Sequence, residues 1–262
     1  MVQIVRYELG DTRHFGILEQ RRIARLRGSP FDGLMTTGAT DDLSSVKVLA
    51  PVEPPRIFGV GWNYTVLTAM TGKSPPEVPN LFMKPSTAVI GPGDSIIYPE
   101  GVEEVHCEAE ITVVIGKRAR YVPESSALDY VLGYTCGNDV TDRKLQVKER
   151  LFGCTFAAKA YDSFAPMGPV IATDLDPARI TLVTRVNGEE RQSDSTANLI
   201  FSVPFLISYL SRVMTLLPGD CIMTGTPAGA TNPVHVGDKV EIEMSGIGVL
   251  RNQIVAEQRP RV

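Results

Sequence analysis

Two glutamates, Glu108 and Glu110, stand two positions apart within an otherwise apolar segment, residues 105–116. We expect a strand here, and alternate residues of a strand share one face, so both carboxylates would point the same way. If that face is buried, two like charges meet in a low dielectric, which is costly unless one is protonated or a cation lies between them. A hard divalent ion is the simplest remedy. The alternative is a strand whose acidic face meets solvent.

A third acid, Asp139, stands where an apolar strand pattern ends and a helical pattern begins. Together with Glu108 and Glu110 it could complete a site of three carboxylates around Mg²⁺ or Mn²⁺, leaving positions for water and for substrate oxygens. The alternative is that Asp139, or Asp142 after it, only caps the helix.

Lys159 lies among small, apolar and aromatic residues, where a lysine needs a partner. It could be a structural counter-ion of the acids, or it could act on the substrate as a proton donor or charge stabiliser. The segment 224–229, rich in glycine and threonine, could offer N–H groups and hydroxyls to an anionic ligand, or it could be an ordinary turn.

Composition narrows the class of protein. The 262 residues are 43% hydrophobic and 21% charged, with a formal net charge of -4 and no basic tract, so we expect no nucleic-acid partner. No apolar run reaches membrane-spanning length and the first residues do not resemble a signal peptide, so we expect a cytoplasmic protein without a membrane partner. Four scattered cysteines and only three histidines leave oxygen atoms as the favoured metal ligands.

The patterns predict an α+β chain that is mainly β. Residues 1–50 read as a small N-terminal domain of short strands followed by a Gly/Ser/Thr-rich passage, and a proline-rich connector then leads into the domain 51–262. Two helices are expected to pack on the sheet. One runs from Asp142 to about Leu151 with Thr141 as its cap, and the other follows Ser202. The second should place these residues on one face: Val203, Ile207, Leu210, Met214 and Leu217.

Seven motifs, in order along the chain, resemble the fumarylacetoacetate hydrolase family, in the branch that includes acylpyruvases, oxaloacetate decarboxylases and 2-hydroxyhepta-2,4-diene-1,7-dioate isomerase/decarboxylases. These motifs occupy residues 61–64, 81–86, 106–116, 137–141, 159–169, 185–188 and 224–229. The resemblance implies a mixed β-sandwich roll of the family's C-terminal type with a small N-terminal β appendage, a homodimer, and a role in aromatic catabolism. It also implies Mg²⁺ or Mn²⁺ bound by Glu108, Glu110 and Asp139.

The resemblance further implies functional roles for other positions. We assign Lys159, Arg143 and Gln146 to catalysis, and we assign substrate binding to Asn63, Tyr64, Gly225 and Thr226.

The chain departs from the family at a lid helix. Many members carry histidine and glutamate after the Asn-Tyr motif, where they order and activate water, but this chain has Leu67 and Met70. A positioned base is worth roughly 10²- to 10⁴-fold in rate, or about 3 to 5 kcal/mol. Stabilisation of an enolate by a metal is worth several kcal/mol and needs no activated water.

We therefore expect a metal-dependent decarboxylase or isomerase that acts on a small 2-oxo or 2-hydroxy-dienoate (di)carboxylic acid through a metal-stabilised enolate. In this scheme the substrate's 2-oxo and carboxylate groups chelate the metal, Lys159 moves a proton, and Arg143 with the Thr226 loop holds the distal anionic end. Two alternatives stay open: a C–C bond hydrolase of acylpyruvates or other β-diketo acids, and a specialised or non-catalytic member whose apolar lid binds a less polar ligand.

Overall fold

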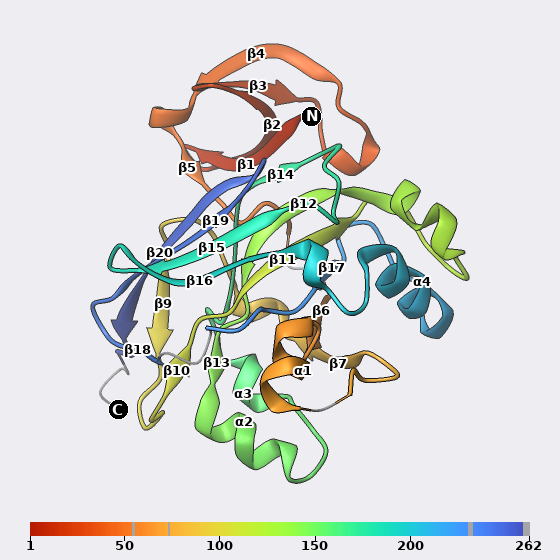
Figure 1. Ribbon diagram of the computed structural model, residues 1–262. Helices are drawn as coiled ribbons and strands as arrows, with labels where there is room; N and C mark the ends of the chain where they lie inside the picture. Colours follow the sequence, from red (N-terminus) through yellow and green to blue (C-terminus); the bar gives the residue numbers. More distant parts are fainter. Residues whose placement is uncertain (54–55, 73, 230–232, 259–262) are drawn as a thin grey trace.

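A computed structural model describes residues 1–53, 56–72, 74–229 and 233–258 and shows a predominantly β architecture (Figure 1). The described strands form three sheets. The largest has twelve strands, and its main path runs in this order: β4 (Thr36–Asp42), β3 (Arg22–Leu26), β2 (Thr12–Glu19), β1 (Gln3–Leu9), β14 (Ala165–Ala172), β12 (Val131–Asn138), β11 (Ala109–Ile115), β17 (Cys221–Met223), β6 (Ile57–Gly61) and β7 (Asn80–Lys84). Off this path, β5 (Lys47–Val48) pairs with β1, and β8 (Val89–Ile90) pairs with β14.

The second sheet has five strands, in the order β16 (Glu189–Ser195), β15 (Thr181–Val186), β19 (Lys239–Met244), β20 (Gly248–Ala256) and β9 (Ser95–Tyr98). It packs on the centre of the large sheet, because one hydrophobic core contains Ile111 and Val113 of β11 together with Leu182 of β15. Two sheets that share a core form a sandwich, so the mainly β, mixed β-sandwich fold is confirmed. A small third sheet joins β13 (Thr141–Asp142), β10 (Val105–His106) and β18 (Pro233–Val234).

Strand β11 occupies the middle of the large sheet, antiparallel to both β12 and β17. All seven of its residues, Glu110 among them, are buried, so the alternative in which its acidic face meets solvent is wrong. The single strand predicted over 105–116 is broken, because Cys107 and Glu108 lie between β10 and β11. Gly137 of β12 lies opposite Glu110. A Cβ atom on Gly137 would stand 2.2 Å from the Thr112 hydroxyl, so only glycine allows the two strands to pair here.

The N-terminal strands extend the large sheet at one end, because β1 pairs with β14 through Gln3 and Ala172. They lie at the top of Figure 1, away from the short helices at the bottom. Strand β4 forms inside the Gly/Ser/Thr-rich passage for which the sequence predicted no strand, and all but one of its residues are exposed. The division into domains at residue 50 stays a prediction.

The described helices are α1 (Thr65–Thr71), α2 (Arg143–Arg150), α3 (Ala157–Ala160) and α4 (Val203–Val213). The cap of α2 is Asp142, whose Oδ1 atom accepts the Leu145 N–H at 3.0 Å; the Thr141 hydroxyl instead donates to the Asp139 carbonyl. The predicted cap, Thr141, is therefore wrong by one residue.

Helix α4 begins after Ser202, whose hydroxyl accepts the Phe205 N–H as expected. Its buried face includes Val203, Ile207 and Leu210. The predicted face is too long, because the helix ends at Val213 and Leu217 beyond it is 41% exposed.

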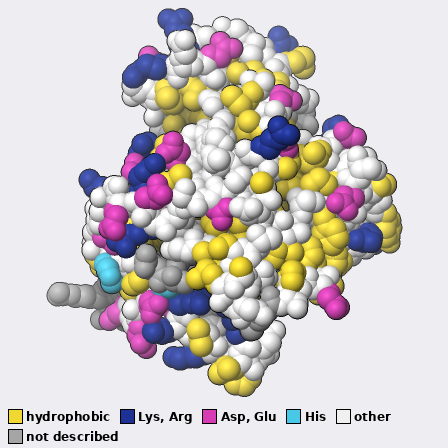
Figure 2. Space-filling model, viewed as in Figure 1, with side chains coloured by type: hydrophobic (Ala, Val, Ile, Leu, Met, Phe, Trp, Pro, Cys, Tyr) yellow, Lys and Arg dark blue, Asp and Glu magenta, His cyan; other side chains and the backbone are white. Residues whose placement is uncertain are grey.

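Figure 2 shows acidic and basic side chains interspersed on the face viewed. Within the described residues, no helix has the length and apolar character needed to cross a membrane.

Candidate metal centre and active site

A cavity of about 230 Å³ opens among the short helices and the ends of the central strands. Its lining comes from five places in the chain: the end of β6 with α1, strand β7, the segment 106–110, the segment 139–159 that contains α2, and the loop 226–229. These segments are far apart in sequence, so the cavity exists only once the large sheet has formed.

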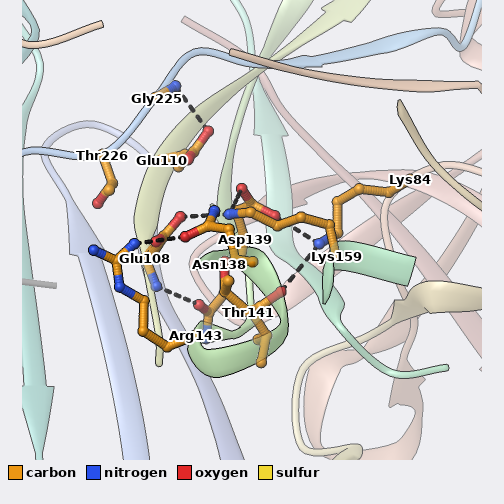
Figure 3. A network of polar contacts seen from close by, with 12 residues as sticks. Lys84, Glu108, Glu110, Asn138, Asp139, Thr141, Arg143, Lys159, Gly225 and Thr226 are labelled. Atoms are coloured by element: carbon orange, nitrogen blue, oxygen red, sulfur yellow. Dashed lines mark hydrogen bonds and ion pairs between the residues drawn. The ribbon is translucent and has the colours of Figure 1, made fainter. Parts of the chain in front are cut away.

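Three carboxylates form one side of this cavity, from Glu108, Glu110 and Asp139 (Figure 3). One oxygen atom from each lies within 4.8 Å of the others. The antiparallel pairing of β11 with β12 creates this cluster, because Ala109 pairs with Asn138 and the Asp139 N–H donates to the Glu108 carbonyl at 2.9 Å. Hard oxygen atoms at this spacing fit a divalent ion such as Mg²⁺ or Mn²⁺. The three residues predicted as metal ligands are thus brought together.

Two buried lysines neutralise part of the cluster. The Lys159 ammonium contacts Glu108 Oε2 at 2.6 Å and also pairs with Asp139, while Lys84 Nζ lies 2.6 Å from Asp139 Oδ1. Burial opposes the charge of Lys159, but Asp139 and the two glutamates outweigh it and raise its pKa. Burial likewise opposes ionisation of Asp139, but Lys159 and Lys84 lower its pKa. When all three carboxylates are ionised they outnumber the two ammonium groups, so the cluster keeps negative charge that a divalent cation can balance.

Glu110 lies deepest in the cluster, with 1% of its surface exposed. Burial first, and then the neighbouring Asp139 charge, raise its pKa well above the ordinary value. The Gly225 N–H donates to Glu110 Oε2 at 2.7 Å. Gly225 has a φ of 101°, and a Cβ atom there would stand 2.9 Å from the Val60 carbonyl oxygen. Gly225 therefore supports a predicted metal ligand and does not itself line the cavity.

Arg143, Gln146 and Thr226 all line the cavity, as predicted for residues that contact substrate. An Arg143 guanidinium N–H donates to the Gln146 side-chain oxygen. The Thr226 hydroxyl accepts from Gln192 Nε2 at 3.0 Å, which fixes the loop that carries it. Their catalytic and substrate-binding roles stay predictions.

Asn63 and Tyr64 lie behind the cavity wall, and both are 0% exposed. The Asn63 side chain accepts the Phe201 N–H at 2.7 Å and donates to the Thr224 carbonyl at 2.7 Å, so it joins two distant loops. The geometry gives no support for direct substrate contact by either residue. Asn63 instead positions the segment that includes Gly225.

Several residues of the site were missed from the sequence. Lys84 pairs with Asp139 behind the cavity wall and closes an apolar strand, so the argument that singled out Lys159 could have identified it too. His106 lines the cavity, with its Nε2 atom 2.7 Å from Glu104 Oε1, and a lone histidine beside Glu108 was a usable signal. The other missed cavity residues are Trp62 and Arg150. Leu67 and Met70 of α1 line the cavity as well, so the departure from the family's lid motif faces the site.

Comparison with known proteins identifies the family. The model of the fumarylacetoacetate hydrolase C-terminal family matches residues 56–255, and a model described as Rv2993c-like, N-terminal, matches residues 3–51. An uncharacterised protein of Archaeoglobus fulgidus is 49% identical over 86% of this chain and 89% of its own length. The homoprotocatechuate catabolism bifunctional isomerase/decarboxylase of Escherichia coli is 44% identical over 77% of this chain but only 47% of its own length.

Solved structures agree. A 2-hydroxyhepta-2,4-diene-1,7-dioate isomerase from Mycobacterium marinum is 37% identical, with a TM-score of 0.90 over 99% of this chain and 100% of that chain. A maleylpyruvate hydrolase from Sphingobium sp. SYK-6, in complex with manganese(II) and pyruvate, is 31% identical, with a TM-score of 0.80 over 98% of this chain and 100% of that chain. The chain therefore belongs to the fumarylacetoacetate hydrolase family.

Proposed function

We propose that this protein is a divalent-metal-dependent enzyme that decarboxylates or isomerises a small 2-oxo or 2-hydroxy-dienoate carboxylic acid by way of an enolate. The observation that carries the proposal is the buried cluster of Glu108, Glu110 and Asp139 in a cavity that also contains Arg143 and Arg150. Carboxylates suit a metal and arginines suit an anionic substrate, so one cavity offers both kinds of partner.

The three carboxylates would hold Mg²⁺ or Mn²⁺. When bound, such an ion polarises a carbonyl and stabilises the negative charge that develops on it, which is worth several kcal/mol. Lys159 holds a proton at Nζ beside Glu108 and Asp139 and keeps their carboxylates in place. Arg143 is available to orient the anionic substrate, with Gln146 positioning its guanidinium.

The fate of the substrate depends on what α1 presents to it. Leu67 and Met70 offer apolar side chains where many relatives offer a histidine and a glutamate that activate water. Decarboxylation and double-bond isomerisation need no activated water, so this lid favours them. The names of the relatives from E. coli and M. marinum support the same reaction classes and a role in aromatic catabolism. Assembly as a homodimer remains part of the proposal.

Hydrolysis of an acylpyruvate is a second candidate, and one observation favours it. His106 lines the cavity and pairs with Glu104, which in turn contacts Lys144 Nζ at 2.9 Å. A histidine oriented by a carboxylate is suited to position water, so this pair could replace the one missing from the lid. The manganese-bound maleylpyruvate hydrolase shows that this fold also supports hydrolysis.

Metal binding and product analysis test the proposal together. Metal-depleted protein should gain activity with Mg²⁺ or Mn²⁺ on at least one of oxaloacetate, an acylpyruvate or a 2-hydroxy-dienedioate, and calorimetry should detect the ion. Release of CO₂ or an isomer supports the first candidate, whereas two acid products support the second. Glu108→Gln and Glu110→Gln should abolish metal binding and lower turnover by about 10³-fold, since several kcal/mol of stabilisation are lost.

Glu103→Gln is the matched control, because Glu103 is exposed and does not line the cavity. It should leave metal binding and turnover as in the wild type. Full activity of metal-depleted Glu108→Gln or Glu110→Gln would contradict the proposal.

A further inference from the structure

One cation of the cavity, Arg150, has so far been counted only as one of the arginines that suit an anionic substrate, with no contact assigned to it. It belongs to α2, where Arg143, Gln146 and Arg150 are separated by three and then four residues. Residues at this spacing share one helix face, and all three line the cavity. At a rise of 1.5 Å per residue, Arg150 lies about 10 Å further along the helix axis than Arg143. The helix thus presents two cationic groups at different distances from its N-terminal end.

The Arg150 guanidinium is half-buried, and among the residues that the structure describes no carboxylate forms an ion pair with it. Burial first, and then the charge of Arg143, lower the pKa of Arg150, and the Glu108 carboxylate opposes them only in part. Most other partly buried arginines of the chain do have partners, for example Arg25, which pairs with Asp41 at 2.8 Å. A cation withdrawn from water without a partner is unfavourable, so Arg150 is a natural place for an anion to bind.

Trp62 holds Arg150 in the cavity wall. The Arg150 Cζ atom lies 5.7 Å from the centre of the Trp62 ring, within the range of a cation–π contact. The backbone of Trp62 has a φ of 62°, in the left-handed region that bulky residues rarely adopt. Such strain persists where the surroundings enforce it, and here the neighbouring Asn63 is fixed by its three hydrogen bonds. A cation–π contact supplies no hydrogen-bond acceptor to the guanidinium, whose N–H groups can therefore still donate to a ligand.

We infer that Arg150 and Trp62 form a subsite for a second anionic group of the substrate. This group is remote from the 2-oxo acid end, which would bind at the metal held by the carboxylate cluster. The inference rests on the proposed function and narrows its substrate class to diacids. A guanidinium binds a carboxylate through two parallel N–H donors, which gives both affinity and orientation. Because Arg150 lies about 10 Å beyond Arg143 along α2, a diacid longer than the four-carbon oxaloacetate is better suited to reach it from the carboxylate cluster.

Two probe acids of equal chain length test the subsite without turnover. 2-Oxoadipate and 2-oxohexanoate share the same 2-oxo acid end and differ only in a distal carboxylate or methyl group. Calorimetry with Mn²⁺-loaded wild-type protein should show at least tenfold tighter binding of 2-oxoadipate. Arg150→Gln should remove most of this preference by weakening the diacid, and Arg150→Lys, which keeps the charge but not the planar fork, should restore part of it.

Lys148→Gln is the matched control, since Lys148 is an exposed cation of the same helix that does not line the cavity. It should keep the wild-type preference. Equal binding of the two acids by the wild type, or an unchanged preference in Arg150→Gln, would overturn the subsite while leaving metal-dependent 2-oxo acid binding intact. A similar loss of both acids in Arg150→Gln would also overturn it, because the subsite predicts a selective loss. Failure of the Mn²⁺-loaded wild type to bind either acid would overturn the proposed function and the subsite together.

Discussion

On one side of the cavity, Glu110, Asp139 and Lys159 have at most 2% of their surface exposed and are tied into a network of ion pairs and hydrogen bonds. On the α1 side, by contrast, the lining residues Leu67 and Met70 are apolar, and Met70 is 69% exposed. In the first region, Glu110 belongs to the fully buried strand β11, Asp139 directly follows β12, and Lys159 comes from the short helix α3 that packs beside them. The second is a seven-residue helix in which no residue is fully buried.

This difference separates two tasks. Metal binding requires ligand atoms held at fixed spacing, which rigid strands with paired backbones provide. Choice of substrate and reaction depends on the groups that surround the rest of the ligand, and these lie on short helices and a loop that tolerate substitution. Relatives named as isomerases, decarboxylases and hydrolases can therefore share one fold and differ at its cavity wall.

Removal of Lys84 should have the largest effect on stability. Lys84→Met leaves the buried Asp139 without one of its two ammonium partners, and breaking a buried ion pair costs roughly 3 to 5 kcal/mol of unfolding free energy. Lys47→Met is the control, because the pair of Lys47 with Asp94 is 2.9 Å long but 57% and 32% exposed, and surface pairs contribute about 1 kcal/mol or less. Urea unfolding of both variants measures the two costs. If both variants lose the same unfolding free energy, burial does not make the pair of Lys84 with Asp139 more stabilising than an exposed pair.

Restoring the lid pair tests the other region. Leu67→His combined with Met70→Glu should raise acylpyruvate cleavage by at least tenfold, within the roughly 10²- to 10⁴-fold that a positioned base supplies. Val66→His combined with Ala69→Glu has the same spacing on α1 but does not face the cavity, so it should add nothing. Product analysis by chromatography decides the outcome. Efficient cleavage by the wild type, with no gain in the restored variant, would show that another pair such as His106 and Glu104 already positions water.

The carboxylate cluster could be predicted because the sequence places acids in an apolar segment, where burying like charges costs free energy. Glu108 and Glu110 stand close together in this segment, and like charges that are buried together require a counter-charge. Strands β6, β9 and β19 are likewise recognisable in the sequence, since each is a short apolar or alternating run limited by turns.

The remaining features depend on contacts between distant segments. Lys84 meets Asp139 only because β6 and β17 place β7 near β11, an order of strands that a single sequence does not reveal. Strand β4 escaped prediction because almost all of its residues are exposed, so pairing with β3 and not burial creates it. Arg150 could have been found from its spacing to Arg143 and Gln146, but nothing in the sequence shows that this helix face meets a cavity.

Thr226 should show the smallest effect, because it joins the rigid region to the variable one through a single bond. Its hydroxyl accepts the Gln192 Nε2 proton at 3.0 Å, and Gln192 also donates to the Pro227 carbonyl at 3.1 Å, so the loop keeps one attachment when the other is lost. Thr226→Val should therefore cost about 1 kcal/mol of stability.

The hydroxyl lost in Thr226→Val should also raise KM for the preferred acid by roughly tenfold or less, with kcat nearly unchanged. A bond made equally in the ground and transition states affects KM alone. Thr226→Ser keeps the hydroxyl and should restore the wild-type KM. If the valine variant binds substrate as tightly as the wild type while the serine variant binds it more weakly, the methyl group and not the hydroxyl is what the substrate contacts, and the loop belongs with the apolar lid.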